Sequence, residues 1–289
     1  MINNEIILEA KNIKVSFRKE NQKKVFGKER QTVLNNVSFY LKKGECLGII
    51  GESGSGKSTL GKVVLGLQRP ENGTITIDGT DLYKYKNKRN KKIRYDISVV
   101  FQDYVSSVNP RFTVMRALDE AINVHTINTG EELDKINRRN MAIELLNNVG
   151  LDESFLNRYP HELSGGQLQR ICIARAVAVH PKIILLDEAV SSLDVSTQTQ
   201  IMDYLMNLRN IYSFSYIFIT HDLSTITYLC DRVLFFNSGN IVEEVDDIKE
   251  LNNVKTEYAI ELLNSVKAFD IVNISKDLKK EEKYIQKAV

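Results

Sequence analysis

The chain has 289 residues, 43% of them hydrophobic and 26% charged, with a formal net charge of +2 at pH 7. This is an ordinary globular composition with ample core, its length fits one large α/β domain or a domain with an inserted subdomain, and its charge favours neither nucleic acid nor acidic lipid. No run approaches the roughly 18 apolar residues of a membrane span and no signal peptide is seen, so we expect a soluble chain whose membrane role, if any, is peripheral.

The three cysteines, Cys46, Cys172 and Cys230, are widely spaced and lie in apolar stretches. They do not have metal-ligand spacing, and we interpret them as small buried hydrophobes in a reducing compartment.

Two segments with β-like alternation, residues 5–17 and 33–42, flank a polar, basic loop from Arg18 to Arg30. They predict an antiparallel edge sheet that leads into the strand before Gly51. Phe17 closes the first of these strands. On the pattern alone, packing on the core explains this aromatic as well as a ligand contact does.

The nonapeptide GESGSGKST, residues 51–59, contains the pattern G-x-x-x-x-G-K-S between an apolar strand and a helix. Its small residues let backbone N–H groups close around a phosphate, which then sits at a helix N-terminus. Lys57 can reach the β- and γ-phosphates, and the Ser58 hydroxyl can ligate Mg²⁺. The nucleotide-binding residues predicted here are Gly51, Ser53, Gly54, Ser55, Gly56, Lys57, Ser58 and Thr59.

After the phosphate helix, ENGTITIDG predicts a strand pair with turn residues at Asn72-Gly73 and Asp78-Gly79. The basic run from Lys84 to Arg94 is typical of a solvated helical face, and phosphate-backbone binding is the alternative. Residues 97–103 predict a short buried strand that ends in Gln102.

Helical periodicity then continues to about residue 180, which predicts a helical subdomain inserted in the α/β core. Within it, HELSGGQLQR (residues 161–170) predicts a second anion-binding helix start. Ser164 is a good N-cap, and Gly165-Gly166 lets N–H groups approach a ligand before Gln167. One compact domain has little use for two such sites on one triphosphate, so we expect ATP to be held between two copies.

The segment KIILLDEA, residues 182–189, reads as a strand buried on both faces, with Asp187 and Glu188 at its carboxyl end, where ligands bind in parallel sheets. A further buried strand, SYIFITHD, ends at His221. Phosphoryl transfer to water needs charge neutralisation and a positioned nucleophile. We assign the first to Lys57 and to Mg²⁺ held by Ser58 and, through water, Asp187.

Glu188 is placed to polarise the attacking water, and His221 can hydrogen-bond the γ-phosphate. An N-cap carboxylate and a satisfied strand-end histidine are the structural alternatives.

The ordered motifs GESGSGKST, Gln102, LSGGQ, IILLDE, SSLD and His221 resemble the ATP-binding subunit of an ABC transporter from about Phe17 to residue 246. The resemblance implies a P-loop NTPase with a RecA-like mixed sheet core, an N-terminal antiparallel β-subdomain and an inserted helical subdomain (about 103–180). The domain would span residues 1–252, and residues 253–289 would form a short C-terminal helical extension with a charged tail.

By that resemblance Phe17 stacks on adenine, and Gln102 senses Mg²⁺ and faces the membrane subunit. Leu163 to Gln167, including Ser164, Gly165 and Gly166, would clamp the γ-phosphate of the opposite subunit's ATP, and Asp194 would couple the two sites. The resemblance implies catalytic roles for Glu188, His221 and Lys57. The Mg²⁺ ligands would be Ser58, Gln102 and, through water, Asp187.

The stretch VVFQDYVSSVNPRFTV (residues 99–114) resembles the dipeptide, oligopeptide and nickel importer ATPases. The loop before the first motif and TEYAIELLNSV (256–266) fit that group's second ATPase subunit, and DEAVSSLD with QLQRICIARAVAV points to the nickel member. Tyr104, where proline is frequent, and the tail depart from the pattern. Peptide import is therefore the alternative to import of nickel or a metal–metallophore complex.

The resemblance also implies the partners: a paralogous second ATPase subunit (or an identical one), two membrane-spanning permease subunits and an extracytoplasmic substrate-binding protein. The expected location is the cytoplasmic face of the cell membrane. No nucleic acid partner is expected, because DNA-repair relatives carry long coiled-coil insertions and ribosomal relatives carry two cassettes. Substrate choice belongs to the binding protein and channel, and the four histidines (His125, His161, His180 and His221) do not have ligand spacing.

Overall fold

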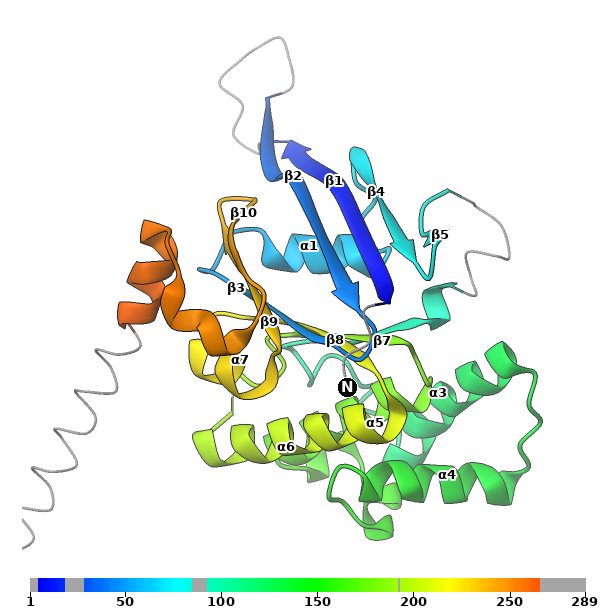
Figure 1. Ribbon diagram of the computed structural model, residues 1–289. Coiled ribbons are helices and arrows are strands. Elements are labelled where there is room, and N and C mark those ends of the chain that lie inside the picture. The colour runs from blue at the N-terminus through cyan, green and yellow to red at the C-terminus, as the bar shows by residue number, and fades with distance from the viewer. Residues whose placement is uncertain (1–4, 19–28, 85–92, 192, 266–289) are drawn as a thin grey trace, which may run out of the picture.

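The computed structural model describes residues 5–18, 29–84, 93–191 and 193–265 (Figure 1). Most of the basic loop predicted between Arg18 and Arg30, most of the basic run from Lys84 to Arg94, Ser192 and the charged tail from residue 266 lie outside these ranges.

A six-stranded sheet forms the centre of the molecule, in the order β10-β9-β3-β8-β7-β6. All neighbouring strands run parallel except β9 and β10, so the sheet is mixed. The strands are β3 (Cys46–Ile50), β6 (Ile97–Val100), β7 (Ile183–Asp187), β8 (Ser215–Thr220), β9 (Arg232–Asn237) and β10 (Asn240–Val245).

Alternate residues of the central strands enter two different cores. Leu185 and Ile219 belong to one buried cluster, whereas Leu186 and Phe218 belong to the other. Side chains alternate across a strand, so a sheet covered on both faces needs apolar residues at every position. This is why Ile183 to Leu186 reads as an unbroken aliphatic run, and the α/β prediction is confirmed.

The first core lies between the central sheet and a four-stranded antiparallel sheet of order β2-β1-β4-β5. Figure 1 shows helix α1 (Lys57–Val64) between the two sheets. The strands are β1 (Ile6–Arg18), β2 (Arg30–Lys42), β4 (Asn72–Ile77) and β5 (Thr80–Asp81). The predicted edge sheet therefore exists, and it is wider than the two strands that the sequence indicated.

One predicted turn is wrong. Asn72-Gly73 opens β4, while the chain reverses only at Asp78-Gly79 between β4 and β5. The Asn72 side chain accepts a hydrogen bond from Gly73 N. A Cβ at Gly73 would collide with the carbonyl oxygens of Lys11 and Asn12, so this glycine permits close strand approach instead of a reversal.

Helices cover the other face of the central sheet (Figure 1): α3 (Val114–Thr129), α4 (Lys135–Asn147), α5 (Gly165–Ala178), α6 (Val195–Tyr212) and α7 (Leu223–Leu229), with 3-10 turns at Glu153–Asn157, Pro160–Glu162 and Ile248–Asn253. Asp134 and Asp194 accept hydrogen bonds at the N-termini of α4 and α6. Within the described residues no helix is long and apolar enough to cross a membrane. The domain limits given above remain predictions.

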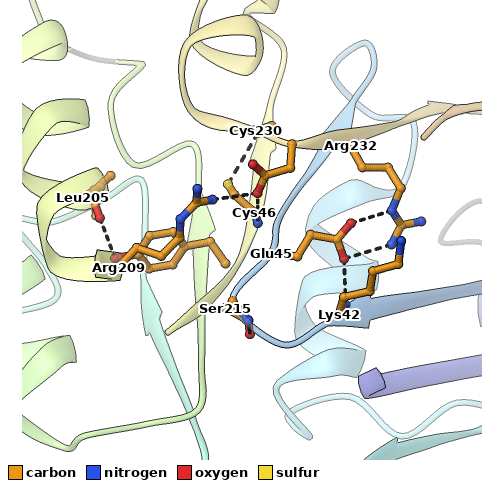
Figure 2. Close-up of polar contacts among 11 residues, drawn as sticks. Lys42, Glu45, Cys46, Leu205, Arg209, Ser215, Cys230 and Arg232 are labelled. Carbon is orange, nitrogen blue, oxygen red and sulfur yellow. Dashed lines mark hydrogen bonds and ion pairs between the residues drawn. The ribbon is translucent and has the colours of Figure 1, made fainter. Parts of the chain in front are cut away.

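A buried ion pair joins the start of β3 to β9 (Figure 2). Arg232 Nε lies 2.7 Å from Glu45 Oε1, and the two side chains are 1% and 3% exposed. Arg232 also donates to the Tyr40 carbonyl at 2.5 Å and stacks on the Tyr40 ring. This network ties β2 to the central sheet.

The three cysteines are buried and free, as predicted. Cys46 and Cys230 bring their sulfur atoms to 3.6 Å from each other beside Arg209 and Asp231 (Figure 2).

Candidate nucleotide site

The loop between β3 and α1 has the backbone that the glycine pattern predicted. Gly54 and Gly56 have φ values of 81° and 110°, a region that residues with a Cβ rarely adopt. A Cβ at Gly51 would collide with the carbonyl oxygen of Phe236 on β9. Helix α1 begins directly after this loop without a side-chain cap at Gly56, and the N–H groups of a helix N-terminus attract an anion. Ser58 and Thr59 lie in the first turn of this helix.

Lys57 is 4% exposed and folds back over its own loop. Its Nζ donates to the carbonyl oxygens of Gly51 and Glu52, both at 2.7 Å. Burial lowers the pKa of Lys57, and the charges of Glu188 and Asp187 oppose that effect. Two loop carbonyls thus hold the ammonium group against the phosphate loop.

Three predicted side chains meet at the carboxyl ends of the parallel strands. Gln102, two residues beyond β6, donates to Glu188 Oε2 at 3.0 Å. His221, the residue after β8, places Nδ1 3.4 Å from the same oxygen. Sequence analysis placed Gln102 at the strand end, whereas β6 stops at Val100 and Gln102 lies on the loop that follows.

The backbone of Glu188 is strained. Its φ is +49°, the left-handed region, although its N–H still continues the sheet by donating to Ile219 O at 2.8 Å. This conformation costs a non-glycine residue about 1 kcal/mol or more. Strained residues gather at functional sites, where the surrounding structure holds the side chain in a required direction.

Asp187 Oδ1 is buried and has no hydrogen-bond partner within the described residues. Burial raises the pKa of Asp187, the nearby charge of Glu188 raises it further, and Lys57 opposes the rise. The Ser58 side chain lies close enough to this carboxyl to oppose the rise in its pKa as well. A buried carboxylate oxygen with a free lone pair beside a serine hydroxyl is the donor set that Mg²⁺ takes in phosphate sites.

The second predicted anion site is built at the start of α5. Ser164 and Gln167 form a reciprocal capping box, with Ser164 N donating to Gln167 Oε1 at 2.9 Å. A Cβ on Gly166 would lie 2.6 Å from Thr197 Cγ2, in the segment that Asp194 caps. Gly165 faces the Tyr104 hydroxyl in the same way.

The structure thus brings the predicted residues together in two groups. The phosphate loop lies with Gln102, Asp187, Glu188 and His221, and Ser164 to Gln167 lie with Asp194. In the parts of the chain that the structure describes, no hydrogen bond or ion pair joins one group to the other.

Phe17 belongs to neither group. It pairs with Gln31 in the antiparallel sheet and is 43% exposed, so it does not pack in the core. This removes the core-packing alternative.

A cavity of about 570 Å³ opens beside the phosphate loop. One wall comes from the predicted site, with Glu188 and His221. A C-terminal helix, residues 257–265, contributes another part of the lining. The full lining is Gly51, Glu52, Ser53, Glu188, His221, Tyr258, Glu261, Leu262 and Ser265.

Known proteins share this fold and are similar in sequence. The chain matches the family described as ABC transporter over residues 34–191, which is more than half of its length. It is 42% identical over 245 residues to the metal-staphylopine import system ATP-binding protein CntF of Staphylococcus aureus, covering 85% of this chain and 94% of that protein. The chain belongs to the ABC transporter ATP-binding proteins.

Other relatives of this ABC protein include the nickel import ATP-binding protein NikE of Escherichia coli O157:H7, with 45% identity over 74% of this chain and 78% of the relative. The oligopeptide transport ATP-binding protein OppF of Haemophilus influenzae is 40% identical over 91% of this chain and 79% of its own.

Among solved structures, a dimeric post-hydrolysis state of an ATP-binding cassette bound to ADP and Pi superposes with a TM-score of 0.72 and 31% identity, over 82% of this chain and 97% of that one. The present chain is therefore an ATP-binding and ATP-hydrolysing cassette, as the motifs predicted.

Two residues beside the site of this ABC protein were not predicted as site residues from its sequence. Tyr104 was noted only as a departure from a family pattern, yet its hydroxyl faces Gly165. Tyr258 was seen only as part of a C-terminal helix, yet its hydroxyl contacts the phosphate loop 206 positions away. No local pattern of residues signals a contact over that separation.

Proposed function

We propose that this cassette powers an importer for nickel or a metal–metallophore complex, hydrolysing ATP that is held between two ATPase subunits. The observation that carries the proposal is that Glu188 and His221 line one cavity beside the phosphate loop, with the buried Lys57 close enough for the charge of Glu188 to act on its pKa. Its relatives include ATP-binding proteins of a metal-staphylopine import system and of nickel import.

In the proposed reaction the phosphate loop binds the triphosphate through its N–H groups, and Lys57 keeps its bond to the Gly51 carbonyl while its other N–H groups donate to phosphate oxygens. Glu188 orients the attacking water and accepts its proton as the water oxygen bonds to the γ-phosphorus. The bond from that phosphorus to the β–γ bridging oxygen breaks, and ADP leaves with phosphate as the second product. Gln102 and His221 both lie against Oε2 of the Glu188 carboxylate. His221 would donate to the γ-phosphate.

Ser58 and Asp187 fit a Mg²⁺ ion, the aspartate through a water molecule, and Gln102 is the third candidate ligand. The free Asp187 Oδ1 supports this assignment. Bound there, the ion would neutralise charge on the β- and γ-phosphate oxygens. The adenine would stack on the half-exposed ring of Phe17.

The separation of the two groups of residues supports a shared site. Ser164, Gly165, Gly166 and Gln167 would close on the ATP of the partner subunit, with Asp194 between the two sites. The partner would be a paralogous ATPase subunit or a second copy. Two permease subunits and a substrate-binding protein would complete the importer, with this chain at the cytoplasmic face of the membrane.

Peptide import is the second candidate, because relatives at 40% and 41% identity are oligopeptide transport ATP-binding proteins. The test is uptake of labelled Ni²⁺, with and without metallophore, against labelled dipeptide in a strain that lacks this gene. Loss of metal uptake, restored by the wild-type gene and not by the Glu188→Gln gene, would support the proposal. Loss of dipeptide uptake alone would reassign the cassette to peptides. Tight, steeply salt-dependent nucleic-acid binding by the purified protein would instead point away from transport.

A further inference from the structure

The C-terminal helix, residues 257–265, is fixed firmly to the central sheet. Glu243 on β10 accepts hydrogen bonds from Lys255 N at 2.6 Å, Thr256 N at 2.8 Å and Thr256 Oγ1 at 2.5 Å, directly before the helix begins. Ala259 and Leu263 are 0% and 7% exposed and pack into the core. Figure 1 shows this segment, in orange, beside β10. The helix is therefore a fixed support for whatever its side chains touch.

Tyr258, in the first turn of this helix, connects it to the phosphate loop. Its hydroxyl accepts a hydrogen bond from Glu52 N at 3.0 Å and donates to the Phe236 carbonyl on β9 at 3.4 Å. One hydroxyl proton and a lone pair satisfy both partners, so the tyrosine bridges β9 and the second residue of the loop.

The bond to Glu52 N matters because of the peptide group to which that nitrogen belongs. Gly51 C=O and Glu52 N–H are the two polar ends of one planar peptide. Lys57 Nζ donates to the Gly51 oxygen at 2.7 Å. At the other end of the same peptide, the Tyr258 hydroxyl accepts the hydrogen bond from Glu52 N. The plane cannot rotate without breaking both bonds, so the tyrosine fixes the direction of the carbonyl that holds the lysine.

We propose that Tyr258 is a positioning residue for ATP binding, which holds the Gly51–Glu52 peptide so that the ammonium group of Lys57 faces the phosphates. The inference rests on the phosphate-loop role proposed above for Lys57. Without the hydroxyl, the peptide populates other orientations, and the apparent affinity for nucleotide is the intrinsic affinity multiplied by the fraction of loops that remain competent. A net hydrogen bond of this kind corresponds to about a 2- to 10-fold change in affinity.

Tyr258→Phe in the full-length chain tests this directly, because it removes one oxygen atom and keeps the ring. We expect the Kd for ATP and ADP to rise by about 2- to 10-fold, with a parallel rise in KM and an unchanged kcat in the assembled transporter. Binding of AMP should not change, since it lacks the phosphates that Lys57 contacts. Tyr212→Phe is the matched control, because its hydroxyl bonds Asn148 Nδ2 at 2.9 Å on the helical side of the molecule.

The decisive measurement is the affinity for ADP in a cycle of Tyr258→Phe, Lys57→Ala and the double variant. If the tyrosine acts through the lysine, the Tyr258→Phe change has little further effect once Lys57 is alanine. The inference would be overturned if the loss of ADP affinity in the double variant equals the product of the two single losses. An unchanged Kd in Tyr258→Phe would also overturn it. Unchanged affinity in Lys57→Ala would instead overturn the phosphate-loop proposal itself, so the two failures are distinguishable.

Discussion

Gln102 and Glu188, 86 positions apart in the chain, meet through a hydrogen bond of 3.0 Å from Gln102 Nε2 to Glu188 Oε2. The amide comes from the loop after β6 and the carboxylate from the end of β7, the strand beside it. A glutamine that the resemblance assigns to the membrane subunit and to Mg²⁺ thus contacts the group proposed to polarise water. Movement of the loop after β6 would therefore break or move the hydrogen bond from Gln102 to the Glu188 carboxylate.

Glu188→Gln should keep ATP binding and lose hydrolysis. An amide can hold the water but cannot accept its proton, and a general base contributes about 10²- to 10⁴-fold. We expect turnover in the assembled transporter to fall by that factor while the Kd for ATP changes little. Equilibrium binding and a phosphate-release assay on the same preparation measure both quantities.

A control for the Glu188 variant is Glu153→Gln, whose exposed carboxylate lies 3.8 Å from Arg139 Nη2 and should leave turnover unchanged. Hydrolysis near the wild-type rate in Glu188→Gln would remove this residue from the role.

Asp187 supports a second prediction, on metal dependence. Its buried Oδ1 has no partner within the described residues, which is the position expected for a ligand to a Mg²⁺-bound water. Wild-type hydrolysis should stop on chelation with EDTA and return with added Mg²⁺. In Asp187→Asn the Mg²⁺ concentration for half-maximal hydrolysis should rise, because the neutral amide attracts the hydrated cation less strongly. A titration with Mg²⁺ at fixed ATP measures this, and full activity in EDTA would contradict it.

The central strands and the phosphate loop were predictable because their requirements are local. A strand covered on both faces needs consecutive aliphatic residues, and Ile183 to Leu186 show them. The loop needs residues that tolerate positive φ, and Gly54 and Gly56 supply them. Each rule concerns neighbours in sequence, so the residues alone reveal it.

The remaining features depend on contacts between distant parts of the chain. Arg232 and Glu45 are 187 positions apart, and neither residue type indicates burial, since arginine and glutamate lie mostly at the surface. Gly73 looked like a turn residue because the approaching strand that requires it, at Lys11 and Asn12, is remote in sequence. Tyr258 likewise could not be predicted as a site residue, because its partner Glu52 is 206 positions away. Sequence patterns located the strand ends, while strand pairing decided which side chains meet there.

The Arg232–Glu45 pair supports a prediction on stability. Arg232→Met should lower the free energy of unfolding by about 3–5 kcal/mol, because it leaves the Glu45 carboxylate buried without its cation. Urea unfolding measures the change. Arg232→Met combined with Glu45→Gln should recover part of the loss.

Lys43→Met is the control for the Arg232 variant, because its ion pair with Glu5, 3.6 Å long, joins side chains that are about half exposed. We expect Lys43→Met to lower the free energy of unfolding by about 0–1 kcal/mol. Equal losses in Lys43→Met and Arg232→Met would contradict the importance of burial.

Glu243 supports a prediction on pH. Burial alone would raise its pKa, but hydrogen bonds from Thr256 and Lys255 outweigh burial and hold the pKa below the ordinary 4.5. A carboxyl with a depressed folded pKa stabilises the protein above its unfolded value, and this stabilisation is lost as pH falls through the folded value. The difference in unfolding free energy between wild type and Glu243→Gln should therefore be constant near neutral pH and shrink below 4.5. A difference that does not vary with pH would contradict the linkage.

The two groups of site residues lead to the last prediction, on assembly. Ser164 to Gln167 cap α5 and have no hydrogen bond to the phosphate loop within the described residues, although both are helix N-termini built to hold an anion. If each ATP is closed by the partner's Ser164 region, a dilute single chain should bind ATP and hydrolyse it poorly.

Specific activity should then rise with protein concentration if the chain pairs with itself, or on addition of the paralogous ATPase if it does not. Ser164→Arg should abolish the rise and leave ATP affinity of the dilute chain unchanged, since the substitution disturbs only the site donated to the partner. Turnover by the dilute chain at the rate of the full complex would show that one polypeptide completes the site.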